Sequence, residues 1–123
     1  MKILVVDDEI DVKDLFQQRF RKEIRKGELT FMFAFSGEEA LQTLNTMEHE
    51  AILILSDINM PGMSGLVLLE KIKKNYVKPP PTVMMITAYG DDENYNTAMK
   101  LGADDFLTKP VDFKLLKQKL LKN

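Results

Sequence analysis

The chain has 123 residues, which is enough for one domain with a buried core and too few for two. Its 45% hydrophobic and 29% charged residues are typical of a globular protein, and the formal net charge of −2 argues against binding to nucleic acid or to an anionic membrane. The chain contains no cysteine, which excludes disulfides and thiolate chemistry, and no apolar run approaches the roughly eighteen residues that cross a bilayer.

The first predicted element is a short buried strand at Lys2–Val6, followed at once by the carboxylates Asp7 and Asp8. Four apolar residues before an acidic cluster do not make a signal peptide. From Asp11 to about Lys26, apolar residues recur at helical spacing, which predicts one long helix that ends at Gly27. The residues expected to face inward are Val12, Leu15, Phe16, Phe20 and Ile24.

The next two units repeat the strand and helix pattern. Thr30–Phe35 is a β-rich segment, and Ser36 with Glu39 forms a capping box that begins a helix. Ile52–Ser56 is a continuous apolar run, typical of a strand covered on both faces, and it ends at Asp57. A loop then leads to a helix that begins near Ser64. The residues expected to face inward from these helices are Ala40, Leu41, Leu44 and Met47, then Leu66, Leu69 and Ile72.

The last third of the chain adds two more units. Pro79–Pro81 is expected to be a rigid connector before a strand at Thr82–Thr87. A short helix follows, roughly from Asp92 to Leu101, with Gly102 at its end. Asp105–Thr108 is a brief fifth strand, and Phe113 to Leu121 is the last helix. The residues expected to face inward are Tyr95, Ala98 and Met99, then Leu116 and Leu120.

Strand and helix therefore alternate five times with short connections. This pattern predicts an α/β fold in which helices cover both faces of a five-stranded parallel sheet. We expect residues 1–123 to form a single domain, with no output domain in this chain.

Polar side chains follow four of the five predicted strands: Asp7 and Asp8, Asp57, Thr87, and Lys109. Because the carboxyl ends of parallel strands meet at one edge of the sheet, we expect these side chains to lie close together. Three neighbouring carboxylates repel one another unless a cation neutralises them. Mg²⁺ prefers such oxygen ligands and keeps positions open for phosphoryl oxygens.

The same residues suit phosphoryl transfer, which depends mainly on positioning and on stabilisation of charge. Asp57 is the central carboxylate and the natural nucleophile, because a carboxylate can form an aspartyl phosphate. Lys109 supplies a positive charge and Thr87 a hydrogen-bond donor.

Four segments in this order resemble the response-regulator receiver domain of two-component signalling, and the likeness covers the whole chain. They are Val5-Val6-Asp7-Asp8-Glu9, the run from Ser56 to Gly65 (SDINMPGMSG), Ile86-Thr87-Ala88, and the run from Gly102 to Pro110 (GADDFLTKP). The resemblance implies a flavodoxin-like, doubly wound (βα)5 fold with strand order 2-1-3-4-5.

The resemblance also implies roles for the site residues. Asp57 accepts a phosphoryl group from a phosphohistidine. Asp8, Asp57 and the backbone carbonyl of Asn59 hold Mg²⁺, for which Mn²⁺ is a possible substitute, and Asp7 binds it directly or through water. Lys109 pairs with the phosphoryl oxygens.

Five further residues have implied roles around the acceptor. Thr87 moves toward the phosphoryl group, and Phe106 turns inward behind it. Pro110 shapes the loop of Lys109 through a peptide bond that is typically cis in this family. Ala88 leaves room for the phosphoryl group, and Tyr89, together with Asn59, influences the access of hydrolytic water.

The resemblance further implies a cytoplasmic protein that catalyses only its own phosphorylation and dephosphorylation and is otherwise no enzyme. The expected partners are a histidine kinase or histidine phosphotransfer protein and an unknown downstream target or fused output domain. The surface formed by the fourth helix, fifth strand and fifth helix is expected to carry the output. No direct contact with nucleic acid or membrane is expected, and the chain is expected to be a monomer or a weak, phosphorylation-dependent dimer.

Three other interpretations remain open. A small Mg²⁺-dependent phosphatase shares the acidic edge, but the chain is too short for a cap domain or substrate pocket. A pseudo-receiver, an interaction module with an unused site, is disfavoured by the complete set of acidic, threonine and lysine residues. A nucleotide- or flavin-binding domain needs a glycine-rich phosphate loop where this chain has Asp7-Asp8-Glu9.

Overall fold

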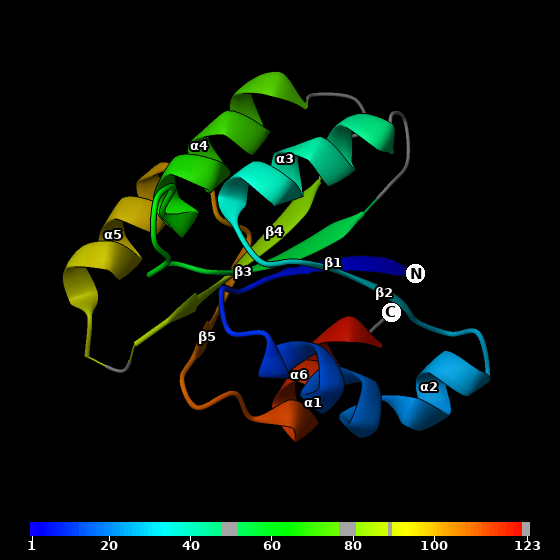
Figure 1. Cartoon of the computed structure of the whole chain (residues 1–123). Coiled ribbons are helices and arrows are strands. Elements are labelled where there is room, and N and C mark those ends of the chain that lie inside the picture. The colour runs from blue at the N-terminus through cyan, green and yellow to red at the C-terminus, as the bar shows by residue number, and fades with distance from the viewer. Residues whose placement is uncertain (48–51, 77–80, 89, 122–123) are drawn as a thin grey trace.

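The computed structural model describes residues 1–47, 52–76, 81–88 and 90–121. A five-stranded parallel sheet of order β2-β1-β3-β4-β5 forms the centre of the molecule. Helices α3, α4 and α5 cover one face, and α1, α2 and α6 lie on the other (Figure 1). The predicted α/β fold and strand order are therefore confirmed.

The bounds of the elements follow the alternation expected from the sequence. The strands are β1 Lys2–Val6, β2 Thr30–Ala34, β3 Leu53–Asp57, β4 Thr82–Thr87 and β5 Asp105–Thr108. The helices are α1 Asp11–Arg19, α2 Arg21–Arg25, α3 Gly37–Thr46, α4 Gly65–Asn75, α5 Asp92–Lys100 and α6 Phe113–Leu120. None of the helices in the described ranges is long and apolar enough to cross a membrane.

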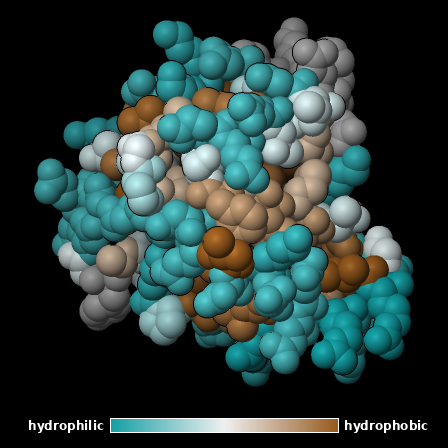
Figure 2. Space-filling model, in the orientation of Figure 1, coloured by the Kyte–Doolittle hydropathy of each residue, from teal (hydrophilic) through white to brown (hydrophobic). Residues whose placement is uncertain are grey.

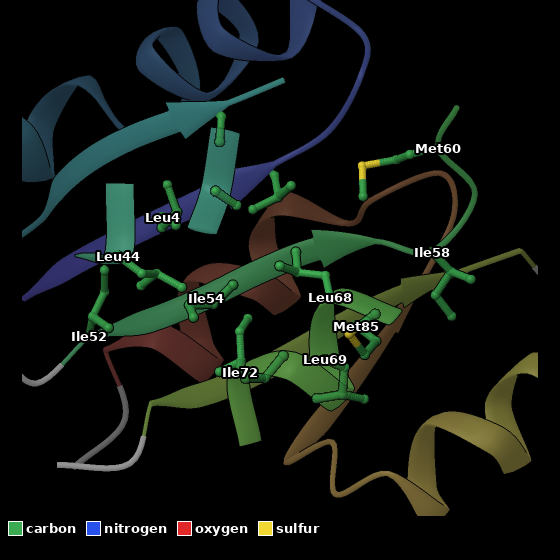
Figure 3. Close-up of a cluster of buried hydrophobic side chains, with 14 of the residues drawn as sticks. Leu4, Leu44, Ile52, Ile54, Ile58, Met60, Leu68, Leu69, Ile72 and Met85 are labelled. Carbon is green, nitrogen blue, oxygen red and sulfur yellow. The ribbon is translucent and has the colours of Figure 1, made fainter. Parts of the chain in front are cut away.

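Each central strand divides its side chains between two cores, because successive residues of a strand point to opposite faces. In β1, Leu4 and Val6 pack on the side of α3, α4 and α5, whereas Ile3 and Val5 pack on the side of α1 and α6. Figure 3 shows the first of these cores, with Leu4 from β1 and other aliphatic side chains from β3, α3 and α4. Strands buried on both faces explain the continuous apolar runs in the sequence.

Short polar side chains cap the N-termini of α3 and α4. Ser36 Oγ accepts a hydrogen bond from the backbone N–H of Glu39 at 3.0 Å, so the predicted N-cap of α3 is present. Ser64 does the same for α4, from Val67 at 3.3 Å. These caps satisfy N–H groups that have no partner within the helix, and they fix where each helix leaves its loop.

The prediction of one continuous helix from Asp11 to Lys26 was wrong. The backbone leaves helical geometry at Phe20 (φ −109°, ψ 23°), where α1 ends and α2 begins. The ring of Phe20 is fully buried and packs against Phe16, Phe31 and Phe113. Aromatic packing at this position therefore accompanies the break in the helix.

The break changes which residues of α2 face the core. Ile24, expected to face inward, is 37% exposed, and Glu23 is buried in its place. One oxygen of Glu23 pairs with Lys117 of α6 at 3.1 Å, and Oε1 has no hydrogen-bond partner among the described residues. Burial raises the pKa of Glu23, but the hydrogen bond and charge of Lys117 outweigh it and hold the pKa below its usual value.

The predictions of core-facing residues in α1, α4 and α5 were only partly right. In α5, Ala98 is fully buried as predicted, but Met99 is 54% exposed and Tyr95 is 39% exposed. In α1, Leu15 is also exposed, and in α4 the sequence analysis missed Leu68, which is fully buried. The connector predicted at Pro79–Pro81 lies outside the described residues except for Pro81.

Gly65 permits a close approach between α4 and the end of β3. Its backbone N–H donates to the carbonyl of Ile58 at 2.7 Å. A Cβ atom at this position would lie 2.1 Å from the carbonyl oxygen of Asp57 and 2.8 Å from Cα of Ile58. The N-terminus of α4 therefore packs directly on the backbone that carries Asp57, and no side chain fits between them.

This contact predicts that Gly65→Ala destabilises the fold by about 2 kcal/mol or more, because the atoms in the way belong to the backbone and cannot move aside. Urea unfolding followed by far-UV circular dichroism measures the effect. Gly37→Ala is the matched control: the three atoms nearest to its Cβ belong to the side chain of Met63, at 2.7–3.0 Å, and none of them is a backbone atom. Equal unfolding midpoints for the two variants would contradict this explanation.

Candidate functional site

Three carboxylates converge at the carboxyl edge of the sheet. Asp7 and Asp8 follow β1, and Asp57 is the last residue of the adjacent strand β3. One oxygen atom of each carboxylate lies within 4.8 Å of the other two. Asp7 and Asp57 are buried, and Asp8 is exposed. The neighbouring positions of β1 and β3 thus bring together residues that are fifty positions apart in the sequence.

Asp57 has a single positively charged partner in the described part of the chain. Lys109 Nζ donates to Asp57 Oδ2 at 2.7 Å, and the Asp57 side chain is only 4% exposed. The backbone N–H of Lys109 donates to the carbonyl of Thr87 at 2.9 Å, which ties the lysine loop to the end of β4. The Lys109–Pro110 peptide bond is cis, the configuration that the resemblance implies.

The environment of Asp7 opposes its ionisation. Burial raises the pKa of its carboxyl group, and the nearby charge of Asp57 raises it further. The backbone N–H of Glu9, which donates to Asp7 Oδ1 at 2.9 Å, and the charge of Lys109 act in the opposite direction but do not cancel the increase. Burial and the neighbouring carboxylate of Asp57 therefore make ionisation of Asp7 less favourable than in water.

The same carboxylates also shift the pKa of Lys109. Burial alone lowers the pKa of its ammonium group, but the hydrogen bond to Asp57 and the charges of Asp57, Asp7 and Glu9 outweigh burial and raise the pKa. Lys109 is therefore held in its protonated form beside the acceptor carboxylate.

Thr87 lies on β4, the neighbour of β3, and Phe106 lies one strand farther, on β5. Thr87 is buried at the end of β4, and its Oγ1 donates to the carbonyl of Leu107 at 3.4 Å. Phe106 of β5 is half-buried, and its ring centroid lies 4.3 Å from that of Tyr95 on α5. In this structure the threonine hydroxyl is thus bonded to β5, and the phenylalanine packs against a partly exposed tyrosine.

The remaining predicted residues lie at the edge of the site. Asn59 is exposed two residues after the acceptor, Ala88 is exposed directly after Thr87, and Pro110 is exposed in the loop after β5. Tyr89 lies outside the described residues. An exposed Asn59 and a small Ala88 leave the acceptor side of the edge open to solvent.

A cavity beside the acceptor was not predicted from the sequence. Its volume is about 490 Å³, and most of its walls are apolar side chains. They include Leu15 and Phe16 of α1, Val111 of the loop before α6, and Phe113 at the start of α6. Its polar lining residues are Asp7, Glu9 and Lys109. The acidic run Asp7-Asp8-Glu9 was the only sequence signal for Glu9, and nothing in the sequence placed it on a cavity wall.

The donor set of the acidic cluster fits a hard divalent cation. Its oxygen ligands come from carboxylates, they converge within one coordination sphere, and their mutual repulsion is only partly relieved by Lys109. Mg²⁺ binds through few carboxylates and several waters, and an edge with one exposed ligand, Asp8, leaves room for such waters.

Comparisons with known proteins agree with this arrangement. The sequence profile of the response regulator receiver domain matches residues 3–121. The chain is 39% identical over 119 residues to the response regulator protein PilR of Pseudomonas aeruginosa, covering 95% of this chain and 24% of PilR. It is 33% identical over 109 residues to the regulatory protein VanR of Enterococcus faecium, covering 89% of this chain and 43% of VanR.

A solved structure gives the same result for the fold. The receiver domain of NtrX from Brucella abortus superposes with a TM-score of 0.77 at 33% identity and covers 98% of both chains. The chain spans less than half the length of the curated relatives that it matches. With a family profile that covers nearly every residue and an acidic edge built as that family requires, the chain belongs to the response regulator receiver domains of two-component systems.

Proposed function

We propose that Asp57 accepts a phosphoryl group from the phosphohistidine of a histidine kinase or histidine phosphotransfer protein. The observation that carries this proposal is the contact between Lys109 Nζ and Asp57 Oδ2 at 2.7 Å, within a cluster of three carboxylates. This pairing places a positive charge beside Asp57, the buried carboxylate that ends the central strand β3. Such an arrangement suits a nucleophile that must receive an anionic group.

In the proposed step, a carboxylate oxygen of Asp57 forms a bond to phosphorus while the bond from phosphorus to the imidazole nitrogen breaks. The imidazole leaves with the electron pair of that bond, and the phosphoryl group becomes an acyl phosphate on Asp57. Lys109, now beside both groups, exchanges its ion pair with the carboxylate for contacts to phosphoryl oxygens. Its raised pKa keeps it charged throughout.

Asp7, Asp8 and Asp57, with the backbone carbonyl of Asn59, would hold Mg²⁺. The metal, when bound, neutralises the carboxylates and the incoming phosphoryl oxygens, and Mn²⁺ is a chemically similar substitute. The chain's own contribution is to hold these oxygens at the carboxyl edge through the neighbouring strands β1 and β3.

Phosphorylation gives Thr87 a new acceptor. Its hydroxyl, which donates to Leu107 in this structure at 3.4 Å, can turn to a phosphoryl oxygen instead. The carbonyl of Leu107 on β5 then loses this hydrogen bond. The space that the Thr87 side chain leaves behind favours movement of Phe106. We infer that α5, β5 and α6 form the surface that passes this change to a downstream partner or fused output domain.

We propose that the protein is cytoplasmic and that the only reactions it catalyses are its own phosphorylation and dephosphorylation. It acts as a monomer or as a weak dimer that forms on phosphorylation. Its partners are the phosphoryl donor and the output, with no direct contact to nucleic acid or membrane. The net charge of −2 supports the last part of this proposal.

Intact mass spectrometry tests the acceptor directly. After incubation with acetyl phosphate or phosphoramidate, we expect a gain of one phosphoryl group that requires Mg²⁺ and is absent in Asp57→Asn, because the amide is not a nucleophile. Asp14→Asn, which neutralises an exposed carboxylate on α1, is the control and should gain the group normally.

Two outcomes would contradict the proposal. A Mg²⁺-dependent gain that persists in Asp57→Asn would place the phosphoryl group elsewhere. Steady hydrolysis of the donor without any modified protein would instead favour a small phosphatase with the same acidic edge.

The charge imbalance at Asp7 predicts a stability effect. Because the folded-state pKa of Asp7 is raised, its ionised form opposes folding above that pKa, and this cost disappears below its ordinary value of 3.8. We therefore expect Asp7→Asn to raise the urea midpoint at pH 7 without Mg²⁺, since asparagine keeps the acceptor for Glu9, and we expect the gain to vanish near pH 3. Destabilisation at pH 7 would contradict this account.

Mg²⁺ should produce a related effect in the unmodified protein. If it binds only the folded state, it adds about 1.4 kcal/mol of stability at tenfold excess over its dissociation constant. Asp7→Asn should reduce this gain because one charged ligand is lost. A urea titration with and without Mg²⁺ measures both quantities, with Asp14→Asn again as the control.

A further inference from the structure

Ser56 is a buried polar residue directly before the acceptor Asp57. In the sheet it pairs with Val6 of β1 and with Met85 of β4, and both of these residues are fully buried. A hydroxyl group is costly to bury among apolar neighbours unless it forms a hydrogen bond. Ser56 is 1% exposed, so the contact that its hydroxyl group makes explains why this position of the strand holds a polar residue.

The hydroxyl group of Ser56 donates to the backbone carbonyl of Asp57 at 2.9 Å. The N–H of the same peptide unit, which belongs to Ile58, donates to the carbonyl of Ile86 on β4 at 3.3 Å. The pairing between β1 and β3 ends at Ser56, one residue before this unit. Ser56 and β4 therefore hold the two polar atoms of the peptide unit that joins Asp57 to Ile58, and the bond from Ser56 is the shorter one.

This peptide unit determines where the chain runs after the acceptor. Because a peptide unit is planar, fixing its carbonyl fixes the direction in which the backbone leaves Asp57 toward Asn59. The carbonyl of Asp57 also lies close to the start of α4, since a Cβ atom on Gly65 would be 2.1 Å from its oxygen. The placement of the Asp57 carboxylate relative to the Asn59 carbonyl thus depends on the bond that Ser56 donates.

We propose that Ser56 is a positioning residue for phosphoryl transfer, whose hydroxyl group holds the Asp57 carboxylate and the Asn59 carbonyl in the relative orientation that the reaction needs. This inference rests on the proposed function of Asp57. Ser56 acts through the backbone, because the side chains of consecutive strand residues point to opposite faces of the sheet. Small misplacements of a reacting group are enough to slow a reaction strongly.

The test compares Ser56→Thr with Ser56→Val. The two replacements have nearly the same shape, but only threonine has a hydroxyl group. Each protein is incubated with phosphoramidate at saturating Mg²⁺, and the rate of phosphorylation is followed by intact mass where far-UV circular dichroism shows the protein folded. We expect Ser56→Val to react about tenfold more slowly than Ser56→Thr, because the acceptor is no longer held in place.

Mg²⁺ affinity gives a second readout that needs no phosphoryl donor. In a calorimetric titration, we expect Ser56→Val to bind Mg²⁺ about tenfold more weakly than Ser56→Thr, since residues that orient metal ligands affect affinity on that scale. A role in folding alone would lower the urea midpoint and would leave both the rate of the folded protein and its Mg²⁺ affinity unchanged.

Ile54→Val is the matched control for stability. Ile54 lies two residues before Ser56 on the same face of β3, is fully buried, and has no polar atom in its side chain. Removing one methylene group from the core lowers the urea midpoint. The rate of phosphorylation and the Mg²⁺ affinity of this variant should match those of the unmodified chain.

Equal rates and equal Mg²⁺ affinities in Ser56→Thr and Ser56→Val would overturn the inference while Asp57 remained the acceptor. Equal losses in Ile54→Val would overturn it too, because lost stability would then explain them. Should the added methyl group prevent folding, Ser56→Ala against the unmodified chain makes the same comparison. If the unmodified chain gained no phosphoryl group, the proposed function would fail, and this inference with it.

Discussion

The ion pair between Lys109 and Asp57 is the interaction on which the arrangement of the site depends. A carboxylate that is 4% exposed is costly to bury unless a positive charge accompanies it, and Lys109 is the partner at 2.7 Å. The sheet order makes this pairing possible. β4 lies between β3 and β5, and the bond from Lys109 N–H to the carbonyl of Thr87 carries the lysine loop back toward the acceptor.

One lysine does not neutralise three carboxylates, and this remaining charge organises the rest of the site. Burial and the charge of Asp57 raise the pKa of Asp7, and the hydrogen bond and charge of Asp57 outweigh burial to raise the pKa of Lys109. The three carboxylates also converge closely enough that they could hold a divalent cation. Burial of apolar side chains in the two cores offsets the unfavourable repulsion between these charges. Ile54 and Leu55, which are consecutive on β3, are fully buried on opposite faces of the sheet. Figure 2 shows hydrophilic residues over most of one face of the molecule, with hydrophobic residues visible mainly toward its middle.

Much of the fold and the site could be predicted because short-range sequence patterns determine them. The apolar run that ends at Asp57 is typical of a strand covered on both faces, and five alternating strand and helix units predict a parallel sheet. The carboxyl ends of parallel strands then bring Asp7, Asp8 and Lys109 to Asp57 without further information.

What could not be predicted depends on long-range packing. The break at Phe20 accompanies ring contacts with Phe31 and Phe113, which are distant in sequence, and the burial of Glu23 follows from that break and from Lys117 on α6. The cavity that includes Glu9 depends on how α1 packs against the loop before α6. No local sequence pattern predicts this packing.

The strength of the contact between Phe106 and Tyr95 depends on temperature. Phe106 has no hydroxyl group, so its contact with the tyrosine ring at 4.3 Å relies on apolar surface and ring attraction. Apolar contacts weaken on cooling and carry a large heat capacity, whereas a hydrogen bond does neither to the same extent. Any rearrangement that exposes or covers these rings therefore has an equilibrium constant that curves with temperature. Under the proposed function, the response of this surface to phosphorylation would therefore vary with temperature.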